Sequence, residues 1–421
     1  MPGRSLYRRL IGLAAFSALA VSAAACTASP TSVVTPSSSV TPTASGSAQP
    51  SATASASTSA TRDASPSPSA TPTPADTDPT FVPALAAIQM VTPTVGWVAG
   101  SHAIYATTDG SHWSRQYAST NDYVSLDFVS TTTGWVVGLH ELLGTTDGGR
   151  SWHALGEASG SLRAVHFVNA LQGWGIAGGS FAQPDHGTLS PDAGGTLVTT
   201  TDGGRSWTGL ASPADAQSIC FSDSKHGWLA TRNGYVYTSN DGGQGWSQRL
   251  SMYGASPSAD SVGKRTRIEC AGPSAAWVLE TVENGAAGHL PYVVYATQDG
   301  SSWRTVLTEP FTIGNQLPGV PAGPDTYPGS FSVVDPLDAV FIGDGPATNV
   351  AACIVANGGG ATLRRTGRID NASETYGAAF VSVSNGWVLT RNANGDTVID
   401  ATNDGGYHWT QQLAVAASSA G

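Results

Sequence analysis

The chain is poor in charged residues, cysteine and basic side chains, and these shortages exclude several classes of protein. Charged residues make up 12% of the 421 residues, and 19 Lys and Arg stand against 30 Asp and Glu, giving a formal net charge of −11. A general nucleic-acid binder normally has a basic surface, so the acidic balance argues against nucleic acid as a partner. The 9 histidines are scattered without metal-ligand spacing, so we predict no metal site and no cofactor.

Long amphipathic helices and phosphate-binding loops are also missing. No stretch repeats its apolar residues with a long helical period, and every Gly-Gly pair belongs to a hairpin-like turn rather than a strand-to-helix junction. The chain has instead 50 glycines, 12 tryptophans and many Ser and Thr residues. This composition suits an all-β protein with many tight turns.

Residues 1–26 have the pattern of an export signal. Three arginines precede an apolar stretch, residues 10–25, which is too short for a comfortable membrane span and rich in small residues. Its end resembles a bacterial lipobox, in which Cys26 would be lipidated, although Ala23 stands where Leu is usual. We predict a lipoprotein-type signal peptide and a location on the outer face of the cell membrane. Ordinary cleavage near Ala24, giving a secreted or wall-associated protein, is the alternative.

Residues 27–80 consist almost wholly of Ser, Thr, Pro and Ala. No periodic apolar face exists there, so burial cannot offset the loss of chain entropy on folding. We predict a disordered tether over 27–80, with membrane attachment only through the lipid, and a folded domain over 81–421.

Two signatures recur along residues 81–421. One, here called the box, has the form Thr-Thr-Asp-Gly-Gly-x-x-Trp with small variations. Its aspartates and tryptophans are Asp109, Trp113, Asp147, Trp152, Asp202, Trp207, Asp241, Trp246, Asp299, Trp303, Asp404 and Trp409. The other is a Gly-Trp or Ala-Trp pair before each box, with tryptophans at Trp97, Trp135, Trp174, Trp228, Trp277 and Trp387. Self-similarity at this period indicates a solenoid or a propeller.

The box is expected to be a structural turn between the third and fourth strands of each repeat. An aspartate there can accept hydrogen bonds from backbone N–H groups of its own turn. The next glycine takes the positive φ that the turn needs, and the tryptophan packs between neighbouring units. Each repeat is thus predicted to be four short antiparallel strands, which is the composition of a propeller blade.

Counting the repeats predicts a seven-bladed β-propeller with four-stranded antiparallel blades. Six repeats have boxes, and a degenerate seventh over 331–359 has lost both tryptophans and the aspartate. Six blades is the alternative if that unit is only an insertion. The first strand, near 84–91, and the last, near 409–415, predict blades of contiguous chain and a ring closed by packing of blade on blade.

The boxes resemble the Asp-box repeats of bacterial neuraminidase (BNR) type. With the Gly-Trp element added, the chain resembles the propeller family of photosystem II stability and assembly factors. The resemblance covers the chain beyond the tether and implies a propeller that serves as a binding or assembly scaffold. Asp-box propellers also include sialidases and xyloglucan-type glycosidases. The long tether and the degenerate repeat depart from the family pattern.

Spacing between boxes predicts a binding face. Insertions at 180–195 and 281–290 fall between second and third strands, and those at 251–266 and 308–329 fall between repeats. In antiparallel blades these connections emerge at one end and the box turns at the other. Loops on a rigid scaffold are a common site of function. The candidate binding residues are Phe181, His186, Tyr253, Lys264, Arg265, Arg267, His289, Phe311 and Tyr327.

Glycan cleavage is the competing function. An ordinary glycosidase needs two carboxylates across a cleft, and Asp127, Glu269 and Asp335 lie on or beside first strands. A sialidase needs an arginine cluster, but only Arg163 and Arg267 occupy matching positions. We therefore predict no enzymatic activity. The predicted function is a monomeric scaffold for a protein partner or envelope complex, with a glycan-binding or glycan-cleaving propeller as the alternative.

Two cysteines lie on equivalent strands of neighbouring repeats. Cys220 and Cys270 stand eight and seven residues before their Gly-Trp or Ala-Trp tryptophans. An exported protein permits a disulfide between them. Two buried thiols are the alternative, since Cys270 occupies a position held by Phe elsewhere.

Overall fold

The computed structural model describes residues 81–155, 162–181, 191–193, 195–251, 264–282, 290–309 and 318–417. For residues 180, 181, 191–193, 264 and 282 only the backbone is described. The predicted signal peptide, Cys26 and the tether lie outside these residues. The described chain forms strands and turns, and no helix occurs within it.

The strands form six blades and a small hairpin. Blade 1 contains β1 (Ala87–Met90), β2 (Gly96–Thr107), β3 (Ser114–Phe128), β4 (Gly134–Gly138), β5 (Leu142–Thr145) and β6 (His153–Ala154). Blade 2 contains β7 (Leu162–Phe167), β8 (Gly173–Ala177), β11 (Thr196–Thr200) and β12 (Thr208–Gly209), and the hairpin is β9 (Ser180–Phe181) with β10 (Pro191–Ala193). Blade 3 contains β13 (Ala216–Phe221), β14 (Gly227–Thr231), β15 (Tyr235–Ser239) and β16 (Ser247–Ser251).

The remaining three blades each have four strands in chain order. Blade 4 contains β17 (Lys264–Cys270), β18 (Ala276–Val282), β19 (Tyr292–Thr297) and β20 (Arg304–Glu309). Blade 5 contains β21 (Tyr327–Val333), β22 (Ala339–Gly345), β23 (Val350–Asn357) and β24 (Thr362–Asp370). Blade 6 contains β25 (Glu374–Phe380), β26 (Gly386–Arg391), β27 (Thr397–Thr402) and β28 (Thr410–Val415).

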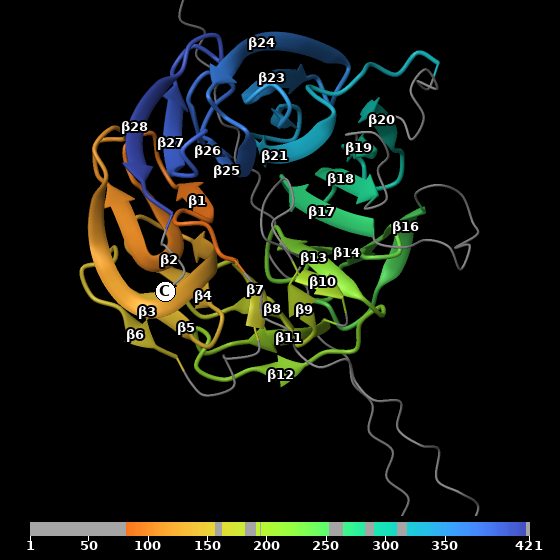
Figure 1. Ribbon diagram of the computed structural model, residues 1–421. Coiled ribbons are helices and arrows are strands. Elements are labelled where there is room, and N and C mark those ends of the chain that lie inside the picture. Colours follow the sequence, from red (N-terminus) through yellow and green to blue (C-terminus); the bar gives the residue numbers. More distant parts are fainter. Residues whose placement is uncertain are drawn as a thin grey trace, which may run out of the picture. The chain divides into compact units, whose positions relative to one another are not determined.

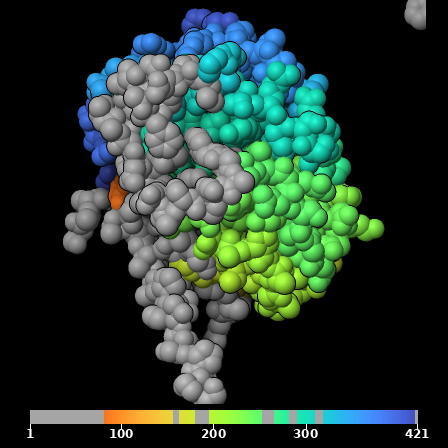
Figure 2. All heavy atoms as spheres, turned by 90° about the vertical axis from the view of Figure 1, so that its right-hand side faces the viewer, coloured from red at the N-terminus to blue at the C-terminus, as the bar shows by residue number. Residues whose placement is uncertain are grey.

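The blades surround a central axis (Figure 1). The first strand of each blade lies innermost, and strands such as β12, β16, β20, β24 and β28 lie at the rim. Figure 2 looks onto the rim and shows the green to blue blades side by side. The fold is therefore an all-β propeller.

The prediction of seven four-stranded blades is wrong. The described strands make six blades, five with four strands and one, blade 1, with six. Strand β3 causes the difference, because its part up to Asp122 pairs with β2 and its part from Tyr123 pairs with β4. No glycine or proline occurs between Ser114 and Phe128 to end the strand. The first two sequence repeats therefore share one strand, whereas the degenerate repeat does form a complete blade, blade 5.

The ring closes by packing, as predicted. Strand β1 pairs with β2, and β28 pairs with β27, so each blade is built from contiguous chain. Where blade 6 meets blade 1, the Trp387 indole N–H donates to the Gly110 carbonyl at 3.0 Å. Trp113 donates to the Gln412 side-chain oxygen at 2.8 Å, and a buried cluster that includes Met90 and Tyr376 fills the same junction.

Stacked aromatic rings join neighbouring repeats. The ring of Trp135 stacks on Phe167 with centroids 3.5 Å apart, and the edge of Trp207 packs against the same Phe167. The Trp135 indole N–H donates to the carbonyl of Gly203 in the next box turn at 2.9 Å. The same arrangement recurs where Trp174 stacks on Phe221, with centroids 3.6 Å apart. The two sequence signatures therefore meet in space, one from each side of a junction between repeats.

Each box turn is held by its aspartate and by a hydroxyl two residues earlier. Asp202 Oδ1 accepts the Ser206 N–H at 2.9 Å, and Thr200 Oγ1 accepts the Gly204 N–H at 2.9 Å. Gly204 has φ of 88°, a conformation that favours glycine. This hydroxyl was not predicted from the sequence, although it recurs as Thr107, Thr145, Thr200, Ser239, Thr297 and Thr402.

These turns predict that acid destabilises the protein. Hydrogen bonds within the turns lower the pKa of all six box aspartates, and those from Ser151, Ser206 and His408 lower the pKa of Asp147, Asp202 and Asp404 to about 2. Unfolded aspartate has a pKa of roughly 3.9, so the unfolded chain binds more protons as the pH falls. The stabilisation is complete above about pH 4 and is lost as the pH falls towards about 2.

Buried carboxylates have the opposite pH dependence. Burial raises the pKa of Asp127, Glu269 and Asp400, so their ionisation in the folded state costs stability as the pH rises through the raised pKa values. We therefore expect the free energy of unfolding, measured by urea titration from pH 2 to pH 8, to be highest in mild acid. A free energy of unfolding that stays constant from pH 4 to pH 2 would contradict the role of the box aspartates.

Candidate functional site

The innermost strands line a cavity on the propeller axis. It has a volume of about 390 Å³, and its walls include Asp127, His166, Glu269 and both Cys220 and Cys270. Two of the carboxylates considered for glycan cleavage, Asp127 and Glu269, therefore line one cavity. The third, Asp335, lies in the turn after β21, where it accepts the N–H groups of Leu337 and Asp338.

A series of polar side chains, here called the inner bridges, connects five pairs of neighbouring strands around the axis. Gln89 exchanges two hydrogen bonds with the backbone of Phe128, at 2.7 and 3.2 Å. Asp127 accepts the Phe167 N–H at 2.5 Å, and Glu269 accepts the Val333 N–H at 2.9 Å. The others are His166 to the Phe221 carbonyl at 2.7 Å and Ser332 to the Phe380 N–H at 3.0 Å.

Burial, nearby charges and backbone N–H groups set the pKa values of the two cavity carboxylates, Asp127 and Glu269. Burial raises the pKa of Asp127, and the nearby His166 and the Phe167 N–H oppose that rise. Burial also raises the pKa of Glu269, opposed by Arg267, whose guanidinium lies 3.7 Å from Glu269 Oε1. Each carboxylate thus uses one oxygen to bind the neighbouring strand. Since an amide, an imidazole and a hydroxyl do the same in other blades, the arrangement fits a structural role.

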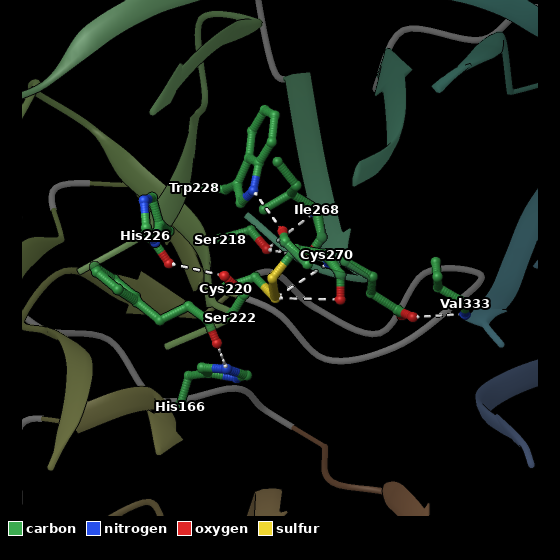
Figure 3. Close-up of a disulfide and its surroundings, with 12 residues drawn as sticks. His166, Ser218, Cys220, Ser222, His226, Trp228, Ile268, Cys270 and Val333 are labelled. Atoms are coloured by element: carbon green, nitrogen blue, oxygen red, sulfur yellow. Dashed lines mark hydrogen bonds between the residues drawn. A yellow bond between two sulfur atoms is a disulfide. The ribbon is translucent and has the colours of Figure 1, made fainter. Parts of the chain in front are cut away.

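The disulfide Cys220–Cys270 joins the inner strands of blades 3 and 4 (Figure 3). Its Cα atoms are 5.8 Å apart, and the Cys270 N–H donates to Cys220 Sγ at 3.1 Å. Cys270 takes the position that Phe167 and Phe221 hold in their blades. Without a phenylalanine there, the edge of Trp303 packs directly on Trp228, with ring centroids 5.9 Å apart. The disulfide therefore replaces both an inner bridge and an aromatic stack. The remaining cysteine in the described chain, Cys353, is buried.

The candidate binding residues do not come together in one described site. His186, Tyr253, His289 and Phe311 lie outside the described residues. Phe181 and Lys264 are described only by backbone, at β9 and at the start of β17. Arg265 lies next on β17 and is partly buried, and Tyr327 begins β21.

Arg267 lies against the next blade rather than on an exposed loop. Its guanidinium sits 4.9 Å from the centroid of the Phe331 ring, and it is 21% exposed. Burial lowers its pKa, while Glu269 opposes that change. Arg163, on β7, is also buried and donates to the Gly179 carbonyl at 3.2 Å. These arginines therefore bind elements of the propeller itself.

The last part of the longest insertion, 308–329, is fixed to the propeller by hydrogen bonds. Residues 318–326 run beside β20, with a parallel bridge between Thr308 and Ala322. Arg365, on β24, donates to the carbonyls of Ala322, Gly323 and Pro324 at 3.2, 2.7 and 3.1 Å. The Tyr292 hydroxyl donates to the Asp325 carbonyl at 2.7 Å. Blades 4 and 5 thus hold this segment, here called the clamped segment, by both of its sides.

Membrane-spanning helices and metal clusters are both absent from the described residues. These residues include no helix with the length and apolarity needed to cross a membrane. Within the same ranges, no three His, Cys, Asp or Glu residues are grouped so that they could hold a metal ion.

No protein-family model and no curated protein matches the chain. Similar solved structures include YCF48 bound to D1 peptide, with 17% identity, TM-score 0.46, and coverage of 76% of this chain and 90% of that chain. YCF48 from Cyanidioschyzon merolae has 16% identity, TM-score 0.49, and coverage of 76% and 95%. An ancestral GH74 enzyme has 16% identity and TM-score 0.52, and the match covers 80% of this chain but only 48% of the enzyme. At 16% identity, the likeness to the GH74 enzyme supports the propeller fold alone.

Proposed function

We propose that this protein is an exported, lipid-anchored propeller that binds a protein partner and performs no catalysis. The clamped segment carries the proposal. Two of its exposed residues, Pro321 and Ala322, lie on a backbone that Arg365 and Thr308 hold from two sides, since the Thr308 N–H donates to the Pro321 carbonyl at 3.0 Å. A pre-ordered segment loses little entropy on binding, which favours recognition of a partner.

Other observations support the remaining parts of the proposal. The disulfide Cys220–Cys270 fits an oxidising, extracytoplasmic location, as does the signal-like sequence of residues 1–26. The inner bridges argue against glycan cleavage, because Asp127 and Glu269 each bind a backbone N–H group of the next blade. A glycosidase needs one carboxyl group free to donate a proton and another free to attack or activate water.

Site-specific photo-cross-linking in intact cells tests the proposed partner. A photoreactive residue in place of the exposed Ala322 should give adducts with a protein of the cell envelope. The same residue in place of Leu337, which is 48% exposed in the turn at the opposite end of blade 5, serves as the matched control. Equal adducts at both positions, or none at Ala322, would contradict a binding surface at the clamped segment.

A glycosidase screen of the unaltered protein tests the absence of catalysis separately. We expect no turnover of oligosaccharides by the full chain. Turnover that disappears in both Asp127→Asn and Glu269→Gln would overturn this part of the proposal without affecting the cross-linking result.

A further inference from the structure

A polar groove lies between the outer strand of blade 5 and the face of blade 6. Its volume is about 390 Å³, and the residues that matter below are Arg368, Asn371, Asn392, Asp400, Tyr407 and Trp409. We call it the β24–β28 groove. It lies at the rim, so it is separate from both the axial cavity and the clamped segment.

Asp400 is the unusual residue of this groove. It lies on β27, four residues before the box aspartate Asp404, and is 8% exposed. The equivalent positions in the other boxed repeats carry apolar or aromatic residues, namely Tyr105, Leu143, Val198, Tyr237 and Tyr295. Turn geometry and core packing therefore do not require a carboxylate here, since five repeats manage without one.

The surroundings of Asp400 leave it able to accept further hydrogen bonds. Its one hydrogen bond within the described chain comes from the Thr390 hydroxyl to Oδ2, at 2.7 Å. An ionised carboxylate can accept about four. Burial raises the pKa of Asp400, which shows that its position costs free energy when it is charged. A ligand that donates to this carboxylate would recover part of that cost.

The groove offers donors and aromatic surface beside this acceptor. Arg368 is exposed, and the Asn371 side chain uses its oxygen to accept the Ala393 N–H at 3.0 Å, which leaves its amide group as a donor. The Tyr407 ring is 49% exposed, and Trp409 is partly exposed. Arg364 lies 5.1 Å from the centroid of the Tyr407 ring and adds positive charge nearby.

This combination discriminates between classes of ligand. A simple cation would meet Arg368, and a simple anion would meet the buried Asp400 and the exposed Asp370, which also lines the groove. A neutral polyhydroxylated ring suits both, because each hydroxyl can donate to the carboxylate and accept from the guanidinium or amide. Its C–H faces can pack on Tyr407 or Trp409. We propose that the β24–β28 groove binds a neutral sugar, one or two rings in size.

Calorimetric titration of the full chain tests this site. The probes are neutral di- to tetrasaccharides of glucose, galactose, mannose and N-acetylglucosamine. We expect at least one of them to bind. Asp400→Leu, which restores the residue type found at Leu143, should weaken that binding by roughly tenfold or more without lowering the melting temperature. A purely structural Asp400 would instead lower the melting temperature when replaced.

Two further variants complete the design. Arg368→Ala changes an exposed residue and should also weaken binding roughly tenfold, so it decides the matter if Asp400→Leu does not fold. Arg304→Ala, in the groove beside β20 where the carboxylate Asp299 is exposed, should bind as the unaltered protein does. Absence of binding to every probe at millimolar concentration, or binding unchanged by Arg368→Ala, would overturn the proposal.

Discussion

Replacing both Cys220 and Cys270 by alanine should lower the free energy of unfolding by about 4 kcal/mol, because the bond closes a loop of 50 residues in the unfolded chain. The loss has a second source in the folded state. At this junction the disulfide takes the place of the phenylalanine stack between the inner strands of blades 3 and 4, so its removal also loses that link. Guanidinium unfolding of the two proteins measures the difference.

Reduction provides the internal control for this prediction. A reducing agent should bring the unaltered protein close to the stability of the double variant, and it should leave the double variant unchanged. Cys353→Ala tests a buried thiol that closes no loop, so its cost should be that of a small core substitution and should not depend on the reductant. A difference below about 1 kcal/mol between the oxidised and reduced unaltered protein would contradict the disulfide as a major stabilising link.

The repeat structure could be predicted because short sequence motifs mark each repeat. Each box combines a turn hydroxyl, an aspartate and a glycine within a few residues, and each Gly-Trp pair marks a second strand. Even the degenerate repeat retained enough alternation around Phe331 and Phe341 to be placed as a unit. The number of blades could not be predicted in this way. It depended on whether one strand continues from Ser114 to Phe128. The absence of a strand-ending glycine or proline is a weaker signal in a sequence than its presence.

The inner bridges were missed because they form between repeats. Nothing within one repeat shows that the residue eight positions before a Gly-Trp tryptophan reaches the next strand. A comparison of repeats would have shown polar or cysteine side chains at Gln89, Asp127, His166, Cys220 and Glu269. The same comparison would have singled out Asp400 as a carboxylate at a position where the other boxed repeats carry apolar or aromatic residues. A comparison of repeats would thus have shown both sites, one as a shared polar position and one as a deviation, whereas the partners of each residue could be seen only in the fold.

The lengths of the insertions predicted which connections between strands are long, but not which of their side chains are available to bind a partner. Arg267 was predicted to belong to the binding face, yet it lies on β17 and packs on Phe331 of the next blade. Arg365 holds the clamped segment, a role that depends on residues more than 40 positions away in sequence. A cluster of charged residues in a sequence therefore does not show whether its side chains bind a loop of the same protein or are free to bind a partner.

Replacing Trp135 by alanine should lower the free energy of unfolding by about 3–5 kcal/mol, which is the range for removing a large buried ring. Trp135 is 3% exposed, stacks on Phe167, and donates its indole N–H to Gly203 of the next box turn. The substitution therefore opens a cavity, removes a ring stack and leaves a buried carbonyl without its donor. Chemical denaturation of the variant and the unaltered protein measures the loss.

Trp152→Ala is the matched comparison, because it removes the same side chain from the box of the same repeat. Trp152 is only partly buried, packs edge-on against Phe128, and its indole N–H has no hydrogen-bond partner in the described chain. Its loss should cost about 1–2 kcal/mol. Equal costs for the two variants would contradict the Gly-Trp tryptophan as the main link between repeats, because the box tryptophan would then contribute as much. A clearly larger cost for Trp135→Ala would instead place the stability of the ring in the stacks between repeats, which is where the disulfide also lies.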